Sequence, residues 1–172
     1  MDLELAGKRV LITGASRGIG AAIARRFLME NANVVIVSRG SDDLFINEKK
    51  LREEFGKSRI YAETCDCTSA SSLMKLKENV QETMNGLDIV VANVGDGRSV
   101  PDPLPSDEQW KKIWNNNFES GLHTARTFIP LLQETHGCFL FISSIAAMEA
   151  FGAPVDYSTA KTAIAALAKN MA

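Results

Sequence analysis

The chain has 172 residues, 45% of which are hydrophobic, and a formal net charge of -2 at pH 7. This length and composition are enough to bury a sizeable core, and we predict a single domain spanning residues 1–172. The weak negative charge gives no electrostatic basis for binding nucleic acid or an anionic membrane, so the expected partners are small molecules or proteins. No apolar run approaches the length of a membrane span.

The N-terminal segment and the cysteines predict a cytoplasmic location. Residues 1–6 lack the basic and apolar segments of a signal peptide. Cys65 and Cys67 flank one aspartate and Cys138 lies in an apolar run, so we expect no disulfide framework. A metal held by Cys65 and Cys67 would need further ligands, and the two histidines are distant in sequence, so we expect no metal site.

Short apolar runs alternate along the chain with longer segments of helical period. The predicted strands are 8–13, 33–38, 59–64, 87–93 and 138–143. The predicted helices are 17–30, one opening at Ser41, 68–84, 106–133 and one beginning near Pro154. This alternation predicts an α/β fold, with a mainly parallel sheet covered by helices on both faces and ligands at the carboxyl ends of the strands.

Capping and turn residues mark the boundaries of these elements. Thr68 is expected to cap the helix that it opens, and Ser106 with Gln109 three residues later forms a capping box. Two glycines and three prolines make residues 95–105 a loop. The asparagines at 115–117 interrupt a helical pattern, which on its own indicates only a frayed or bent turn.

A glycine-rich turn joins the first strand to the first helix, where exposed amides and the positive end of the helix dipole suit a phosphate. Its spacing is Gly-x-x-x-Gly-x-Gly, and alone it is more often merely a turn. The strand before it and the helix after it favour dinucleotide binding. The candidate cofactor-binding residues of the turn are Gly14, Ser16, Arg17, Gly18, Ile19 and Gly20.

Tyr157 and Lys161 are four residues apart, which places both on one face of the last predicted helix. A phenol beside an ammonium favours proton-transfer chemistry, because the positive charge stabilises the phenolate. Such a pair also arises often by chance, and Ser144 alone carries little information.

Taken together, these motifs resemble the classical short-chain dehydrogenase/reductase family. They are the Gly14 to Gly20 pattern, Asn93-Val94-Gly95, Asn117, Ser144 and Tyr157-x-x-x-Lys161. The resemblance covers nearly the whole chain, but only the first part of the family's fold. It implies a Rossmann-like doubly wound parallel sheet, C-terminally truncated, and an oxidoreductase that interconverts a carbonyl and an alcohol.

The resemblance also implies roles for four catalytic residues. Tyr157 would act as general acid or base, and Lys161 would favour its phenolate and hold the nicotinamide ribose. Ser144 would hydrogen-bond the reacting oxygen, and Asn117 would hold a water in a proton relay. The hydride itself would come from the cofactor.

The residues after the second predicted strand bear on the choice of cofactor. An acid there would bind the ribose 2′-hydroxyl of NAD, but the chain has Ser38 and Arg39. Arg39 together with Arg17 would suit the 2′-phosphate of NADP, so NADP is favoured over NAD. Asp66 and Cys67 resemble the family's adenine contacts. The alternative role of Asp66 is purely structural, as a capping residue near Thr68. Asn93, Gly95, Tyr157 and Lys161 complete the expected cofactor contacts.

Two departures from the family pattern stand out. Ala92-Asn93-Val94-Gly95 replaces the typical Asn-Asn-Ala-Gly, and the chain stops at Ala172 without a helix stop signal. We therefore hypothesise that the sequence is part of a longer enzyme and that its fifth strand is an exposed apolar edge. The rival interpretation is a cofactor-binding or partner-binding module without turnover. By resemblance we also expect a homo-oligomer, a dimer or tetramer; the sequence identifies neither the substrate nor the direction of the reaction.

Overall fold

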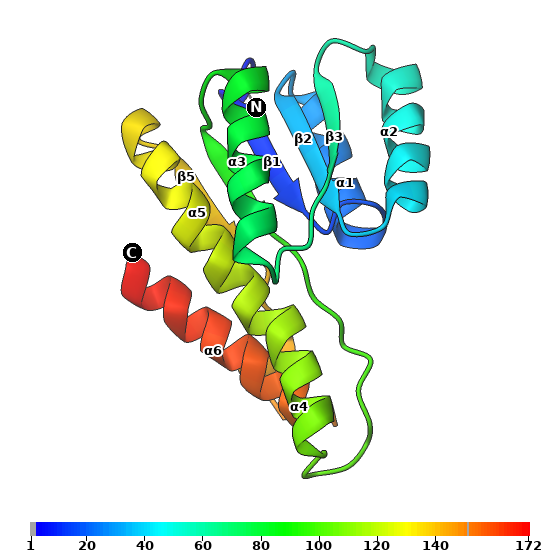
Figure 1. Cartoon of the computed structure of the whole chain (residues 1–172), viewed down its shortest axis with the longest axis vertical. Coiled ribbons are helices and arrows are strands. Elements are labelled where there is room, and N and C mark those ends of the chain that lie inside the picture. The colour runs from blue at the N-terminus through cyan, green and yellow to red at the C-terminus, as the bar shows by residue number, and fades with distance from the viewer. Residues whose placement is uncertain (1–2, 151) are drawn as a thin grey trace.

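The computed structural model describes residues 3–150 and 152–172 and shows strands and helices in alternation (Figure 1). The strands are β1 (Arg9–Thr13), β2 (Asn33–Ser38), β3 (Ile60–Thr64), β4 (Ile89–Ala92) and β5 (Cys138–Phe141). The α-helices are α1 (Gly18–Met29), α2 (Ser41–Phe55), α3 (Ala70–Met84), α4 (Asp107–Trp114), α5 (Ser120–Thr135) and α6 (Val155–Met171). A π-helical turn, η1 (Asn115–Glu119), joins α4 to α5, and a 3₁₀ turn, η2 (Ile145–Ala147), follows β5.

Within the described residues the strands form one five-stranded sheet in the order β3-β2-β1-β4-β5. All neighbouring pairs are parallel, and Leu11 of β1 lies between Val35 of β2 and Val90 of β4. The chain proceeds outward from β1 in one direction through β2 and β3, and in the other through β4 and β5. This reversal leaves a crevice at the carboxyl ends of β1 and β4, where such sheets bind ligands. The predicted doubly wound α/β fold is confirmed.

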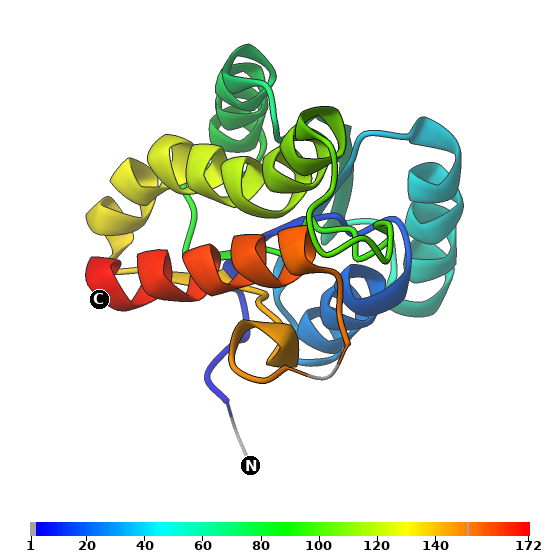
Figure 2. The same cartoon turned by 90° about the horizontal axis from the view of Figure 1, so that it is seen from below.

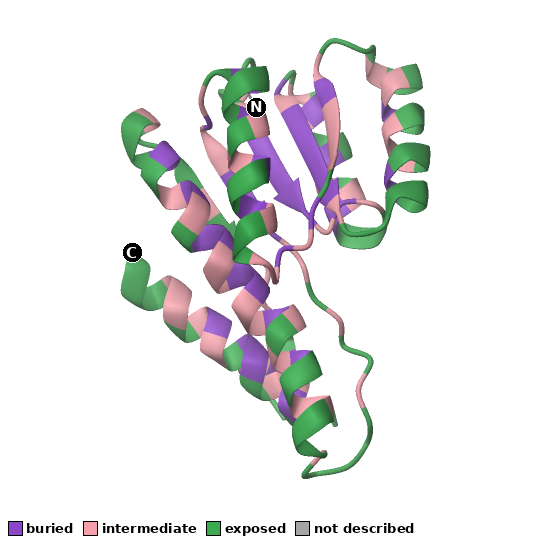
Figure 3. Ribbon diagram, in the orientation of Figure 1, coloured by how far each residue is buried: buried purple, intermediate pink, exposed green. Residues whose placement is uncertain are grey.

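Helices cover both faces of the sheet, and each face has its own core. On one face Leu11, Val37 and Val90 pack with residues of α3 and α5, including Leu76 and Phe128. On the opposite face a second cluster joins β1 and β2 to α1 and α2 (Figure 3). Strands buried on both sides are expected to be continuously apolar, which explains the Val-Leu-Ile and Val-Val-Ile-Val runs of β1 and β2.

The edge strand β5 differs from the inner strands. Its residues alternate between exposed and half-buried, and the Leu140 side chain is 43% exposed. Phe139 packs against the core on the α3 and α5 face, whereas Leu140 has no such cover. The expected exposed apolar edge is therefore present at β5.

Several predicted boundaries need correction. The helix expected over residues 106–133 is divided by η1, and the fifth strand ends at Phe141 instead of residue 143. The cap of α3 is Ser69, whose hydroxyl accepts a hydrogen bond from the amide of Ser72, because the expected cap Thr68 is bonded to Asp66. None of the described helices is long and apolar enough to cross a membrane.

Candidate active site

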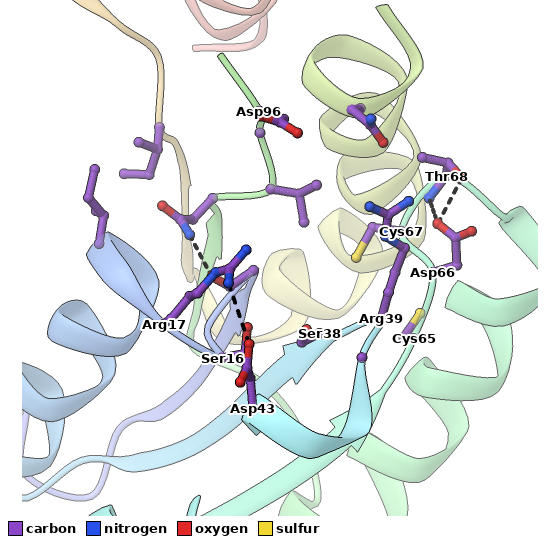
Figure 4. Close-up of a pocket in the computed structure, with 18 of the residues that line it drawn as sticks. Ser16, Arg17, Ser38, Arg39, Asp43, Cys65, Asp66, Cys67, Thr68 and Asp96 are labelled. Carbon is purple, nitrogen blue, oxygen red and sulfur yellow. Dashed lines mark hydrogen bonds and ion pairs between the residues drawn. The ribbon is translucent and has the colours of Figure 1, made fainter. Parts of the chain in front are cut away.

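A cavity of about 1000 Å³ opens at the carboxyl ends of the strands (Figure 4). Its walls come from the segments after all five strands and from the first turns of α6. The predicted site residues on these walls are Gly14, Ser16, Arg17, Ile19, Ser38, Arg39, Asp66, Cys67, Asn93, Gly95, Tyr157 and Lys161. Four predicted residues do not line the cavity: Gly18, Gly20, Asn117 and Ser144.

The glycine turn forms the base of the cavity beside β1. Gly14 and Gly18 have φ values of +64° and +58°, which favour glycine, and a Cβ at Gly18 would meet open space. Gly20 is needed for a different reason, since a Cβ there would overlap the carbonyl oxygen of Gly14 and the side chain of Asn93. The turn therefore depends on glycine for both its path and its packing.

Asn93 fastens this turn to the end of β4. Its Nδ2 donates to the carbonyl oxygens of Thr13 at 3.2 Å and Gly14 at 3.0 Å. Its backbone amide donates to the Thr13 hydroxyl at 3.1 Å. These bonds connect the two strands that flank the crevice and give Asn93 a clear structural function.

Two arginines reach the cavity from different elements. Arg17 stands at the start of α1 and forms an ion pair with Asp43 of α2 at 3.5 Å, whereas Arg39 extends toward Asp66 and Thr68 (Figure 4). Both arginines are exposed, so their guanidinium groups are accessible to an anion. Asp43 was not among the predicted site residues, yet it also lines the cavity and offsets the positive charge of Arg17.

Asp66 lines the cavity directly after β3 and begins the turn before α3. Its Oδ1 accepts hydrogen bonds from the Thr68 amide at 3.0 Å and the Thr68 hydroxyl at 2.8 Å. Burial acts to raise the pKa of Asp66, but these two bonds and the charge of Arg39 outweigh it and hold the pKa below its ordinary value. The carboxylate is thus kept charged at neutral pH.

Lys161 is the most deeply buried cation of the site, with only 4% of its surface exposed. Its ammonium donates to the Ile142 carbonyl oxygen at 2.9 Å and lies 6.0 Å from the centre of the Tyr157 ring. Burial disfavours the charged form and lowers the pKa of Lys161 from 10.5 to about 8. The ammonium therefore titrates near neutral pH and faces the cavity together with Tyr157.

Asn117 is buried within the π-helical turn. Its Nδ2 donates to the carbonyl oxygens of Ile113 and Asp96, both at 3.0 Å, and its Oδ1 accepts from the Asp96 amide at 3.0 Å. A Cβ added to Gly95 would lie 2.9 Å from both Asn117 Oδ1 and Lys161 Nζ. Asn117 therefore holds the loop after β4 in place, close to Lys161.

Ser144 caps the 3₁₀ turn after β5. Its hydroxyl oxygen accepts a hydrogen bond from the Ala146 amide at 3.2 Å. The cavity wall at this end is formed by Ile142 and Ser143, and the Ser143 hydroxyl donates to the Lys161 carbonyl oxygen at 2.9 Å. Ser144 thus stands just beyond the part of the wall formed by Ile142 and Ser143.

Sequence reasoning missed the charged pair that follows Gly95. Asp96 and Arg98 both line the cavity and are joined by two side-chain bonds of 2.9 and 3.0 Å. The hydrogen bond from Arg98 holds the pKa of Asp96 below its ordinary value. The sequence did contain a signal for this pair, because an acid and a base stand two residues apart in a glycine-containing loop.

The thiols Cys65, Cys67 and Cys138 are free. Among residues 3–150 and 152–172, no group of three or more histidine, cysteine, aspartate or glutamate side chains is arranged to hold a metal ion.

Comparison with known proteins assigns the family. The model of the short chain dehydrogenase family matches residues 8–172, so the chain belongs to this family. It is 32% identical over 173 residues to the uncharacterized oxidoreductase YvrD of Bacillus subtilis. This match covers 100% of this chain and 64% of that protein.

Solved structures agree with this assignment. L-sorbose reductase from Gluconobacter frateurii, solved with NADPH and L-sorbose, superposes with a TM-score of 0.92 at 30% identity, covering 99% of this chain and 65% of that one. A family member from Burkholderia phymatum, solved with NAD, superposes with a TM-score of 0.91 at 20% identity, covering 98% and 60%. The chain spans less than two thirds of the length of each of these three relatives.

Proposed function

We propose that the protein transfers hydride between NADP(H) and a carbonyl or alcohol substrate, with Tyr157 as general acid and base. The observation that carries the proposal is the placement of Tyr157 and the buried Lys161 on the wall of the same cavity that the glycine turn opens into. A structural pairing on a helix surface would not require burying an ammonium at this position.

The residues present fit a dinucleotide. Gly14 and Gly18 leave the amides at the start of α1 unobstructed, as a pyrophosphate requires, and the cavity extends from there past Asp66 in one direction and to Lys161 in the other. When bound, the cofactor supplies or accepts the hydride. The chain itself has to bind and orient it and move the proton.

Tyr157 provides the proton in our proposal. During carbonyl reduction its hydroxyl donates to the oxygen that becomes the alcohol, and during alcohol oxidation its phenolate accepts that proton. Lys161 supports the phenolate by its positive charge and, by resemblance, holds the nicotinamide ribose. Because the pKa of Lys161 is about 8, this support weakens as the pH rises above that value.

Ser144 and Asn117 take supporting roles. We propose that the Ser144 hydroxyl hydrogen-bonds the reacting oxygen when substrate is present, since its current bond uses only an oxygen lone pair and leaves its proton available. Asn117 fixes the Asp96 backbone beside Lys161, and we propose that it serves the proton path by holding this geometry.

We propose NADP(H) as the preferred cofactor because Arg17 and Arg39 stand where the adenosine ribose would lie. Neither Ser38 nor Arg39 offers the carboxylate that recognises an NAD ribose. Both arginines line the cavity and are exposed, so they can form forked hydrogen bonds to a 2′-phosphate. The bound NADPH of the Gluconobacter frateurii reductase is consistent with this preference.

The decisive variant is Tyr157→Phe, which removes one hydroxyl from the cavity. We expect NADPH oxidation with a panel of aldehydes and ketones to fall by at least about a hundredfold, while NADPH binding changes little. Tyr61→Phe is the matched control, because Tyr61 lies on β3 and its hydroxyl bonds only the Ser58 carbonyl oxygen. We expect this control to retain normal turnover.

The assay distinguishes an active oxidoreductase from a cofactor-binding module without turnover. Turnover that survives in Tyr157→Phe would contradict the assigned chemistry. NADPH binding without turnover of any carbonyl in the wild type would favour a cofactor-binding module instead of an enzyme.

A further inference from the structure

A buried carboxylate stands directly beside Tyr157. Asp156 occupies the first turn of α6 with only 1% of its surface exposed. Burying a carboxylate is costly unless hydrogen bonds and local dipoles compensate the charge. The N-terminus of α6 supplies a favourable dipole, and the Tyr157 amide donates to Asp156 Oδ1 at 2.7 Å. The other oxygen of Asp156 has a partner far away in the sequence.

That partner belongs to the loop after β4. The Ser99 hydroxyl donates to Asp156 Oδ2, and the Gln109 side-chain amide of α4 donates to the Ser99 oxygen at 3.1 Å. One carboxylate thereby joins three segments: the helix that carries Tyr157, the loop and α4. The same contact explains why the Gln109 side chain does not complete the capping box expected with Ser106.

These bonds anchor a loop that passes over Tyr157. Asn117 holds the loop at Asp96, and Asp156 holds it at Ser99. Between the two anchors lies Gly97, where an added Cβ would be 3.7 Å from the Tyr157 ring. The intervening residues Asp96, Gly97 and Arg98 all line the cavity. The loop is thus a wall of the cavity beside the tyrosine.

We propose that Asp156 is a positioning residue that holds this loop, through Ser99, as the wall of the substrate site beside Tyr157. The loop position stands on the geometry alone, whereas its consequence for substrate rests on the proposed oxidoreductase function. The anchor acts through Ser99 and does not touch the region of the glycine turn. Loosening it should therefore weaken the binding of the carbonyl substrate while leaving NADPH binding unaffected.

The test uses Ser99→Ala, which removes the loop bond and preserves the bond from the Tyr157 amide to Asp156. Ser99→Thr keeps a hydroxyl and should restore wild-type behaviour. Asp102→Asn is the control within the loop, because the Asp102 carboxylate bonds only the nearby Leu104 amide. The full chain is used in each case.

Two readouts are compared. Hydrogen exchange of peptides covering residues 96–104 should become at least about fivefold faster in Ser99→Ala, because the variant loses the bonds of the Ser99 hydroxyl to Asp156 and Gln109. The KM for the carbonyl should rise by a similar factor of about five, with kcat and the Kd for NADPH within about twofold of wild type. Ser99→Thr and Asp102→Asn should match the wild type in both.

Unchanged loop exchange in Ser99→Ala would overturn the proposal. So would a parallel change in kcat, carbonyl KM and NADPH affinity, because that pattern indicates a general loss of structure. If the wild type reduces no carbonyl, the proposed function fails, and loop exchange alone decides whether Asp156 anchors the loop.

Discussion

The two ends of the cavity are held in different ways. At the glycine-turn end the chain is fixed by backbone geometry and by inner strands buried on both faces. At the Tyr157 end the cavity is lined by Ile142 and Ser143, which follow β5, and the 3₁₀ turn η2 lies beside the start of α6 (Figure 2). Near this end Leu140 of β5 is 43% exposed and Met148, directly after η2, is 84% exposed. The loop there is fastened by a few hydrogen bonds that Asp96 and Ser99 donate to the side chains of Asn117 and Asp156.

This difference matches two separate tasks in the proposed function, which are binding the cofactor and selecting the substrate. In the proposed function the glycine-turn end binds a cofactor whose shape does not vary, so a rigid surface built from backbone is suitable. In the proposed function the Tyr157 end accepts a substrate, and such surfaces are built from loops that vary without disturbing the sheet. We therefore expect substitutions at the first end to affect stability and cofactor binding, and those at the second to affect substrate binding or turnover.

Gly20→Ala should produce the largest effect on stability. The new Cβ would overlap the Gly14 carbonyl oxygen, a backbone atom that cannot rotate away, so we expect a loss of at least about 3 kcal/mol in the free energy of unfolding. NADPH binding should fall with it. The matched control is Gly40→Ala, where nothing lies within 4 Å of the added Cβ and the expected cost is below about 1 kcal/mol. Equal unfolding midpoints for both variants in urea would contradict the rigid character of this end.

Lys161→Met should reveal how much the buried Lys161 ammonium lowers the free energy of unfolding. The pKa of Lys161 is lowered from 10.5 to about 8 on folding, so between these values the unfolded chain binds more protons than the folded chain. The wild-type free energy of unfolding should therefore rise with pH through this window, by up to about 3 kcal/mol relative to Lys161→Met.

The comparison is made by urea unfolding from about pH 7 to about pH 10. Lys169→Met, an exposed substitution on the same helix, should follow the wild type. A difference between wild type and Lys161→Met that stays constant with pH would show that Lys161 does not carry a lowered pKa.

Of these variants, Arg39→Ala should change the free energy least, but it should discriminate most sharply between NADPH and NADH. Losing a forked contact to a 2′-phosphate should weaken NADPH binding by about ten- to a hundredfold and leave NADH binding nearly unchanged. Arg98→Ala is the control, because Arg98 is another exposed arginine of the same cavity and is already paired with Asp96. Calorimetric titration with both cofactors measures the preference. Equal or tighter NADH binding by the wild type would reverse our choice of cofactor.

The sequence was sufficient for the fold because its local signals were consistent. The Val-rich inner strands and the glycine turn each encode their structure within a few neighbouring residues. Twelve of the sixteen predicted site residues line the cavity, since family motifs fix residues such as Gly14, Asn93 and Lys161 at known places in the fold. The fold and these cavity residues could be predicted because they depend on short-range sequence patterns or on backbone geometry.

The contacts that hold the Tyr157 end could not be predicted. The Ser99 to Asp156 bond joins residues 57 apart, and the Asn117 clamp on Asp96 spans 21 residues. Such pairings appear only when the chain is folded, because neither partner has a local motif. The ion pair of Arg17 with Asp43 was missed for the same reason.

The most direct test of the account is to follow the label of NADPH deuterated at the transferable position of the nicotinamide. After incubation with a carbonyl compound that the wild type reduces, we expect deuterium on the carbinol carbon of the alcohol, and Tyr157→Phe should form this labelled alcohol at least about a hundredfold more slowly. Bound NADPH that labels no product in any carbonyl reaction, or equal labelling by Tyr157→Phe, would contradict it.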